Sequence, residues 1–450
     1  MWKNYLFTIK IISIYLNFFM DLQLRSKNTP SFQERFFLTI GLLTLVRVGS
    51  FIPLPYIDIK TFSPLLEPNT STTAVATILN NFSGGGNASF SILSLGILPN
   101  INASIIIQLL TTINPTLLKL QKEEGEYGRR KLTDYTRYLT FFCSIIASIV
   151  ATYSFRSLIF DWNILVLTQI SLTLMAGSMI ILWFSELITK NGIGNGTSIL
   201  ICFNIVSNFP DQLRSMILVL SKQNIIISFF IGGIFLLTTV GCIYINEAMV
   251  KIPLVSASQL LRNVNKFSLW NQSNLPLRVN QAGVMPLVFT SSVMVILSSL
   301  TTFLYGQLLN IEFFSFLNYL STNLTLGIGK IFYWSAYGIL VFFFTSFYST
   351  ILLDPKDMTE QFRKNSVTIK GITPGKPTKN YLSITIKRLT ILNAVFLVFV
   401  LILLNGLEYL LPIGDLNLRG FGLTSQLILV NVLVDTFRKV QNLLNAENMF

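Results

Sequence analysis

The sequence predicts an all-α membrane protein that crosses the bilayer ten times. Of its 450 residues, 52% are hydrophobic and only 12% are charged, whereas about a quarter of the residues in a soluble domain carry a charge. A helix needs about 20 mostly apolar residues to cross a membrane. Ten segments approach this length: 36–54, 89–111, 138–157, 164–184, 196–210, 224–245, 283–304, 331–353, 389–407 and 421–437.

The basic residues support these spans and set their orientation. Lys and Arg gather in loops that remain on the side of synthesis. Counted from the N-terminus, the odd-numbered hydrophilic segments hold 26 of the 33 Lys and Arg residues, the even-numbered ones hold 6, and Arg47 lies within the first span. We therefore expect both termini on the cytoplasm-like side. Two loops, 245–282 and 354–388, are more basic than orientation requires and are candidates for docking an acidic or RNA-rich partner.

The apolar stretch at residues 6–20 is shorter and is interrupted by Lys10 and Asn17. We interpret it as an amphipathic helix in the membrane interface. An eleventh span is the alternative.

The chain lacks the residues of common catalytic and metal sites. It contains no His, which excludes imidazole catalysis and His metal ligands. Its cysteines, Cys143, Cys202 and Cys242, fall within predicted spans, which favours buried thiols over a disulfide framework. The carboxylates at 123–131 stand beside a basic run, and this favours a solvated loop over an acid–base or metal site. We expect no enzyme.

Polar residues within the membrane are concentrated in spans two, five, seven and ten. Such groups persist only where they face protein or water. Any one of them could make an ordinary interhelical hydrogen bond, but together they favour a water-filled path between these spans, with Pro99 loosening the helix of span two. Those in span two and at the start of span seven are Asn100, Asn102, Gln108, Asn280 and Gln281.

Near the middle of the membrane the residues are aliphatic rather than ionisable. Acidic and basic residues lie toward the ends of the spans, which argues against a proton-coupled or ion-coupled carrier. A ring of branched aliphatic side chains would form a seal that gates by dewetting and closes around variable cargo. The same residues could equally be plain core: Ile97, Ile101, Ile201, Val288 and Ile428.

Several long motifs resemble the SecY family, the central subunits of bacterial and plastid protein-translocation channels. The resemblance runs from about residue 31 to 448 and includes "VRVGSFIPLPYID" at 46–58, "LGILPNINASIIIQLL" at 95–110, "LPLRVNQAGVMPLVF" at 275–289 and "LTSQLILVNVLVDT" at 423–436. It implies ten helices in two inverted five-helix halves around an hourglass pore. The implied function is passage of unfolded polypeptides across the membrane and lateral release of hydrophobic segments into lipid.

The resemblance also implies a division of the chain and a set of functional residues. An N-terminal extension at 1–30 precedes a first half at 31–210, a second half at 211–440 and a tail at 441–450. The five aliphatic residues above would form the pore ring, and the five polar residues above would line the lateral gate. The plug, about 74–86, would include Ala74, Leu79, Phe82, Ser83, Gly84 and Gly85. The basic loops would dock partners through Lys251, Arg262, Lys266, Lys370, Thr373 and Lys376.

The implied partners are small membrane subunits similar to SecE and SecG, a SecA-type ATPase or a ribosome or both, the translocating polypeptide and the lipid bilayer. No cofactor or metal is implied. Thr373, Val250 and Ser258 stand where the family usually has basic residues, and Leu423 stands where Gly is common. We therefore expect weaker coupling to a motor, or an adapted partner.

Two other functions remain open from the sequence. A secondary carrier for a small solute would share the polar groups in the membrane, and a structural assembly subunit would need neither pore nor solute. The abundance of Ile, Asn, Phe and Lys and the loop "VKIPLVSASQL" favour a plastid-encoded protein in the thylakoid membrane over a bacterial plasma-membrane protein.

Overall fold

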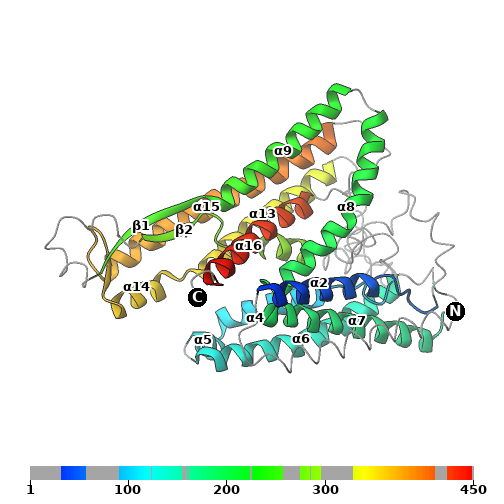
Figure 1. Ribbon diagram of the computed structural model, residues 1–450, viewed down its shortest axis with the longest axis horizontal. Coiled ribbons are helices and arrows are strands. Elements are labelled where there is room, and N and C mark those ends of the chain that lie inside the picture. Colours follow the sequence, from blue (N-terminus) through cyan, green and yellow to red (C-terminus); the bar gives the residue numbers. More distant parts are fainter. Residues whose placement is uncertain are drawn as a thin grey trace.

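The computed structural model describes residues 32–56, 91–122, 124–154, 159, 162–222, 225–256, 274–283, 285–294, 328–410 and 423–447 (Figure 1). The segment 6–20 and the plug positions at 74–86 lie outside these residues, as do Arg262, Lys266 and Ser258.

Every predicted span contains a described helix. In chain order these are α2 (Phe32–Gly49), α4 (Leu98–Ile113), α6 (Gly125–Ser154), α7 (Ile164–Asn191), α8 (Gly196–Lys222), α9 (Ile225–Glu247), the helix Met285–Met294, α13 (Ile328–Leu352), α15 (Lys376–Leu410) and α16 (Leu423–Glu447). Two short helices, α5 (Pro115–Lys122) and α14 (Pro355–Lys364), lie between spans.

The described helices show the expected membrane crossings only in part. By length and composition, α6, α7, α15 and the helical stretch that contains α13 could each cross a membrane alone. The pair α4 and α5 would be a fifth crossing, with a bend of 108° between the two helices. The protein is therefore a mostly helical membrane protein, and among the described residues one candidate span is broken by a bend.

The helices form two groups. In Figure 1, α2, α4, α6 and α7 lie together, α9, α13, α15 and α16 lie together, and α8 runs from the first group toward the second. Within the groups, α4 and α7 both pack against α6, and α13 packs against α15. α16 contacts α8 and α2 as well as α9, so it joins the two groups.

Two helices begin well before the predicted spans. α6 begins at Gly125 and α15 at Lys376, rather than at 138 and 389. The described part of this region, 124–131, is mostly exposed as expected, but from Gly125 onward it is a helix rather than a loop. Its first turns are polar, with an ion pair between Glu126 and Arg130 at 3.7 Å, so a search for apolar residues cannot detect them. At a rise of about 1.5 Å per residue, α15 is longer than a bilayer is thick.

Span two is shorter than predicted, because residues 91–97 form turns and α4 begins at Leu98. Gly96 has a φ of +55°, which glycine adopts readily. Pro99 lies in the first turn of α4, where a missing N–H costs nothing. The expectation that Pro99 loosens the middle of a helix is therefore wrong, since Pro99 helps to start one.

A small sheet is the exception to the all-α prediction. β1 (Met249–Ser256) pairs with β2 (Asn274–Arg278) and with β3 (Val367–Ile369), both antiparallel, in the order β2-β1-β3. Its buried side chains pack against the start of α15: Ile252, Leu277 and Ile369 against Leu382 and Ile386. The sheet therefore joins the two basic loops, which lie far apart in the sequence, into one structure.

A substitution at Gly177 of α7 would test how closely α7 packs against the segment before α4. A Cβ there would lie 2.0 Å from the backbone oxygen of Ile92, just before α4. We expect Gly177→Ala to lower the melting temperature in detergent, because overpacking costs about 1–3 kcal/mol. Gly232 of α9 has no atom within 4 Å of such a Cβ, so Gly232→Ala should be neutral or stabilising. Equal melting temperatures for both variants would contradict this packing.

Candidate functional site: an aliphatic cluster beside a polar cavity

The five aliphatic residues that the sequence singled out lie in one buried hydrophobic cluster. Each is at most 5% exposed. They come from distant parts of the chain: Ile97 and Ile101 at the start of α4, Ile201 in α8, Val288 in the helix Met285–Met294, and Ile428 in α16. The fold thus places these branched aliphatic side chains, from both groups of helices, in the same large buried cluster.

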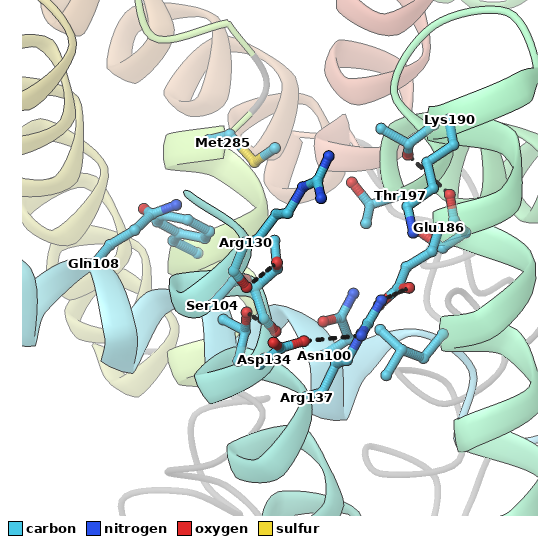
Figure 2. A pocket seen from close by; sticks show the side chains of 16 residues that line it. Asn100, Ser104, Gln108, Arg130, Asp134, Arg137, Glu186, Lys190, Thr197 and Met285 are labelled. Carbon is cyan, nitrogen blue, oxygen red and sulfur yellow. Dashed lines mark hydrogen bonds and ion pairs between the residues drawn. The ribbon is translucent and has the colours of Figure 1, made fainter. Parts of the chain in front are cut away.

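Beside this cluster lies a cavity of about 710 Å³ (Figure 2), which we call the polar cavity because most of its lining residues are polar or charged. Asn100, Ser104 and Gln108 line it from α4, and Met285 and Phe289 line it from the helix that carries Val288. Spans two, five and seven therefore contribute to the cavity as expected. Spans three and four also contribute, through α6 and α7, while no residue of span ten is among the lining residues of the described chain.

A charged cluster connects two of the helices around the cavity. Arg137 of α6 donates from Nε to Oε1 of Glu186 on α7 at 2.6 Å, and a second N–H pairs with Oε2. A third N–H of Arg137 donates to Asp134 at 2.9 Å, and Figure 2 shows these groups around the cavity together with Arg130 and Lys190. Sequence reasoning missed this pairing, because the partners are far apart in the chain and each alone looks like an ordinary span-end charge.

The predicted lateral-gate residues divide between two environments. Asn100 and Gln108 line the cavity; the Asn100 side-chain oxygen accepts from Thr140 at 3.4 Å, and Gln108 reaches the hydroxyl of Tyr348 on α13. Asn102 is not among the lining residues, and its buried side-chain oxygen has no hydrogen-bond partner within the described chain.

Asn280 and Gln281 lie away from the cavity lining, among the helices of the second half. Asn280 donates to Asn246 and accepts from Asn393 at 3.1 Å. Gln281 accepts from the Ser349 hydroxyl at 2.8 Å. Both residues therefore hydrogen-bond to neighbouring helices from the segment just before the helix Met285–Met294.

The described residues of the predicted docking loops are exposed on and around the small sheet. Lys251 lies on β1, Lys370 follows β3, Thr373 lies between β3 and α15, and Lys376 is the first residue of α15. The Lys370 backbone N–H donates to the Pro253 carbonyl at 3.2 Å, which ties the two loops together.

Comparison with known proteins identifies the family. The SecY family profile matches residues 91–437. A protein of Vaucheria litorea, described as protein translocase subunit SecY, is 55% identical over 436 residues, which are 96% of this chain and all of that protein. The chain belongs to the SecY family. It is accordingly a protein-conducting channel of the Sec translocase, a transporter rather than an enzyme.

Solved structures show the same fold. A chain described as a protein conducting channel superposes with a TM-score of 0.64 at 18% identity, covering 93% of each chain. Sec61 in the canine ribosome-channel complex from the endoplasmic reticulum gives a TM-score of 0.62 at 17% identity, again over 93% of each chain. These likenesses confirm the SecY fold predicted from the sequence motifs.

The Arg137–Glu186 ion pair should contribute little to the free energy of unfolding, although it is bidentate. The Arg137 side chain is 41% exposed and that of Glu186 is 26% exposed, and such pairs contribute about 0.2–1 kcal/mol. We expect a double-mutant cycle of Arg137→Gln and Glu186→Gln, read by denaturant unfolding in detergent, to give a coupling energy in this range. A coupling energy of several kcal/mol would show that the pair is effectively desolvated.

Proposed function

We propose that polypeptide enters through the polar cavity and passes through a ring made of Ile97, Ile101, Ile201, Val288 and Ile428. The observation that carries the proposal is the position of this buried aliphatic cluster directly beside a cavity lined by polar and charged groups. A hydrated chain needs a wet entrance. Beyond it, a narrow apolar constriction excludes water and ions when no chain is present.

Hydrophobic segments would leave sideways into lipid between spans two and seven. Asn100, Asn102, Gln108, Asn280 and Gln281 are the proposed gate residues. Gln108 already reaches from α4 to Tyr348 of the second half, and a polar contact of this kind can break and re-form at little net cost. The plug at 74–86 would close the opposite side of the ring.

The basic loops would dock the partner that supplies the driving force. Lys251, Lys370 and Lys376 are exposed around the sheet, with Arg262 and Lys266 in the same loops. One solved relative is described in a ribosome-channel complex, and ribosomal RNA is a polyanion that such a basic surface attracts. A SecA-type ATPase would use the same loops, and small subunits similar to SecE and SecG would complete the complex.

The proposed location is the thylakoid membrane of a plastid. The residue usage favours a plastid-encoded chain, and the alga Vaucheria litorea supplies a relative that is 55% identical.

A stalled secretory chain should crosslink to the ring. We expect cysteines placed at 97, 101 and 201 to react with a single-cysteine nascent chain, in a background where Cys143, Cys202 and Cys242 are replaced by Ala. A cysteine at Leu172, which is 59% exposed on α7, is the control and should not react. Saturable uptake of one small solute without these crosslinks would favour a carrier, and the absence of both would favour an assembly subunit.

Restoring a basic residue should strengthen motor coupling. Thr373 is exposed and stands where the family usually has Arg, so Thr373→Arg should raise both the affinity of a SecA-type ATPase and ATP-driven transport in reconstituted membranes. Ser383→Arg, at an exposed position of α15, controls for added charge. Unchanged binding and transport in Thr373→Arg would refute the weakened-docking hypothesis.

A further inference from the structure

The end of α9 is held by a cation from α16. Arg438 donates to the backbone oxygen of Asn246 at 2.8 Å and pairs with the Glu247 carboxylate at 2.8 Å. The last carbonyls of a helix have no partner within the helix and lie at the negative end of its dipole, so a cation is favoured there. β1 begins immediately afterwards, at Met249. Arg438 therefore holds the point where α9 passes into the β1–β2 hairpin.

Four asparagines from four elements form a directional chain of hydrogen bonds beside this point. Asn393 of α15 donates to Asn280, Asn280 donates to Asn246 at the end of α9, and Asn246 donates to Asn431 of α16. All four are at most 7% exposed. Amides that both accept and donate polarise one another in a low dielectric. The chain therefore ties α9, α15, α16 and the approach to span seven together.

The two ends of this chain have unused hydrogen-bonding capacity. Oδ1 of Asn393 and Nδ2 of Asn431 are buried without a partner among the described residues. A buried polar atom without a partner is costly. If the helices shifted, these two atoms could gain hydrogen bonds that the present arrangement lacks. A partly satisfied network can therefore favour a second arrangement of the same helices.

One face of α16 connects the junction to the ring. Ile428, Asn431, Asp435 and Arg438 are spaced by three or four residues, which places them on the same face of the helix. The first residue of this stripe, Ile428, belongs to the proposed ring. The last, Arg438, binds the end of α9.

The same face also meets the start of span seven. A Cβ at Gly283 would lie 3.5 Å from Oδ2 of Asp435, so this carboxylate lies beside the N-terminal end of the helix Met285–Met294, where negative charge is favoured. That helix carries Val288. Polar contacts thus connect the end of α9, where the hairpin begins, to α16, which carries Ile428, and to the segment just before the helix that carries Val288.

We propose that this junction, made of Asn246, Asn280, Asn393, Asn431 and Arg438, transmits docking of a ribosome on the β1–β2 hairpin to the ring. The inference rests on the docking proposed above. A shift of the hairpin first displaces the end of α9. The hydrogen bonds between the asparagine side chains then transmit this displacement to α16 and to the start of span seven. Its members are positioning residues, since none lines the cavity.

The experiment separates docking from insertion. Reconstituted channels carrying Asn246→Leu or Arg438→Met are mixed with ribosomes bearing a stalled secretory chain, and ribosome affinity and crosslinking of the chain to a cysteine at position 101 are measured separately. We expect unchanged ribosome affinity and a loss of crosslinking of about tenfold, within the usual range of coupling between sites. Arg438→Lys keeps a cation at the end of α9 and should restore most of the crosslinking.

Thr152→Val is the matched control. It removes a buried polar contact of 3.3 Å with Ser171, between α6 and α7 and far from the hairpin, and it should change neither measurement. If Asn246→Leu fails to accumulate, the Arg438 variants decide, because Arg438 lies nearer the surface, with 17% of its side chain exposed.

Three results would overturn the coupling role. These are normal crosslinking in the junction variants, ribosome affinity that falls in parallel with crosslinking, and an equal loss of crosslinking in Thr152→Val. Failure of the docking proposal is recognised differently: Lys251→Glu with Lys370→Glu would leave ribosome affinity unchanged in an otherwise unaltered channel. That result would refute docking at the hairpin, and with it the coupling, whatever the junction variants do.

Discussion

Polar groups within a membrane need partners that hydrocarbon cannot supply, and this constraint shapes both groups of helices. In the group that contains α9 and α15, Asn246, Asn280, Asn393 and Asn431 hydrogen-bond to one another. In the group that contains α6, Asn100 and Gln108 line a cavity. The same residue types therefore stabilise helix packing on one side of the molecule and line a cavity on the other.

The aliphatic cluster is held by a different kind of force. Its members make no directional bonds, and their burial stabilises the packing of the helices roughly in proportion to the apolar area removed from water, at about 25 cal/mol per Å². Such contacts can be replaced by contacts with almost any other side chain. The proposed ring would therefore suit a channel whose cargo varies at every residue, because no specific hydrogen bond has to be broken for each one.

The small sheet has a core of its own. Ile252, Leu277 and Ile369 pack with the start of α15 in a cluster separate from the one that contains the ring. The sheet, as the proposed docking surface, therefore has a stable core of its own outside the hydrophobic core of the membrane helices. Among the described residues, the sheet is connected to the rest of the molecule through α9, α15 and the contacts of Arg438, and the proposed coupling depends on these contacts.

The sequence by itself determined the membrane class, the ten helical segments and the SecY family, because hydropathy, charge bias and long motifs are properties of neighbouring residues. The role of the five aliphatic residues as a pore ring stays a prediction. Only the tertiary structure decided which distant groups meet. The Arg137–Glu186 pair, the sheet that joins residues 249–256 with 367–369, and the asparagine chain all link segments that are distant in sequence. Local periodicity carries no information about such pairings. It also missed the polar starts of α6 and α15, because a helix beyond the membrane needs no apolar face around its whole circumference.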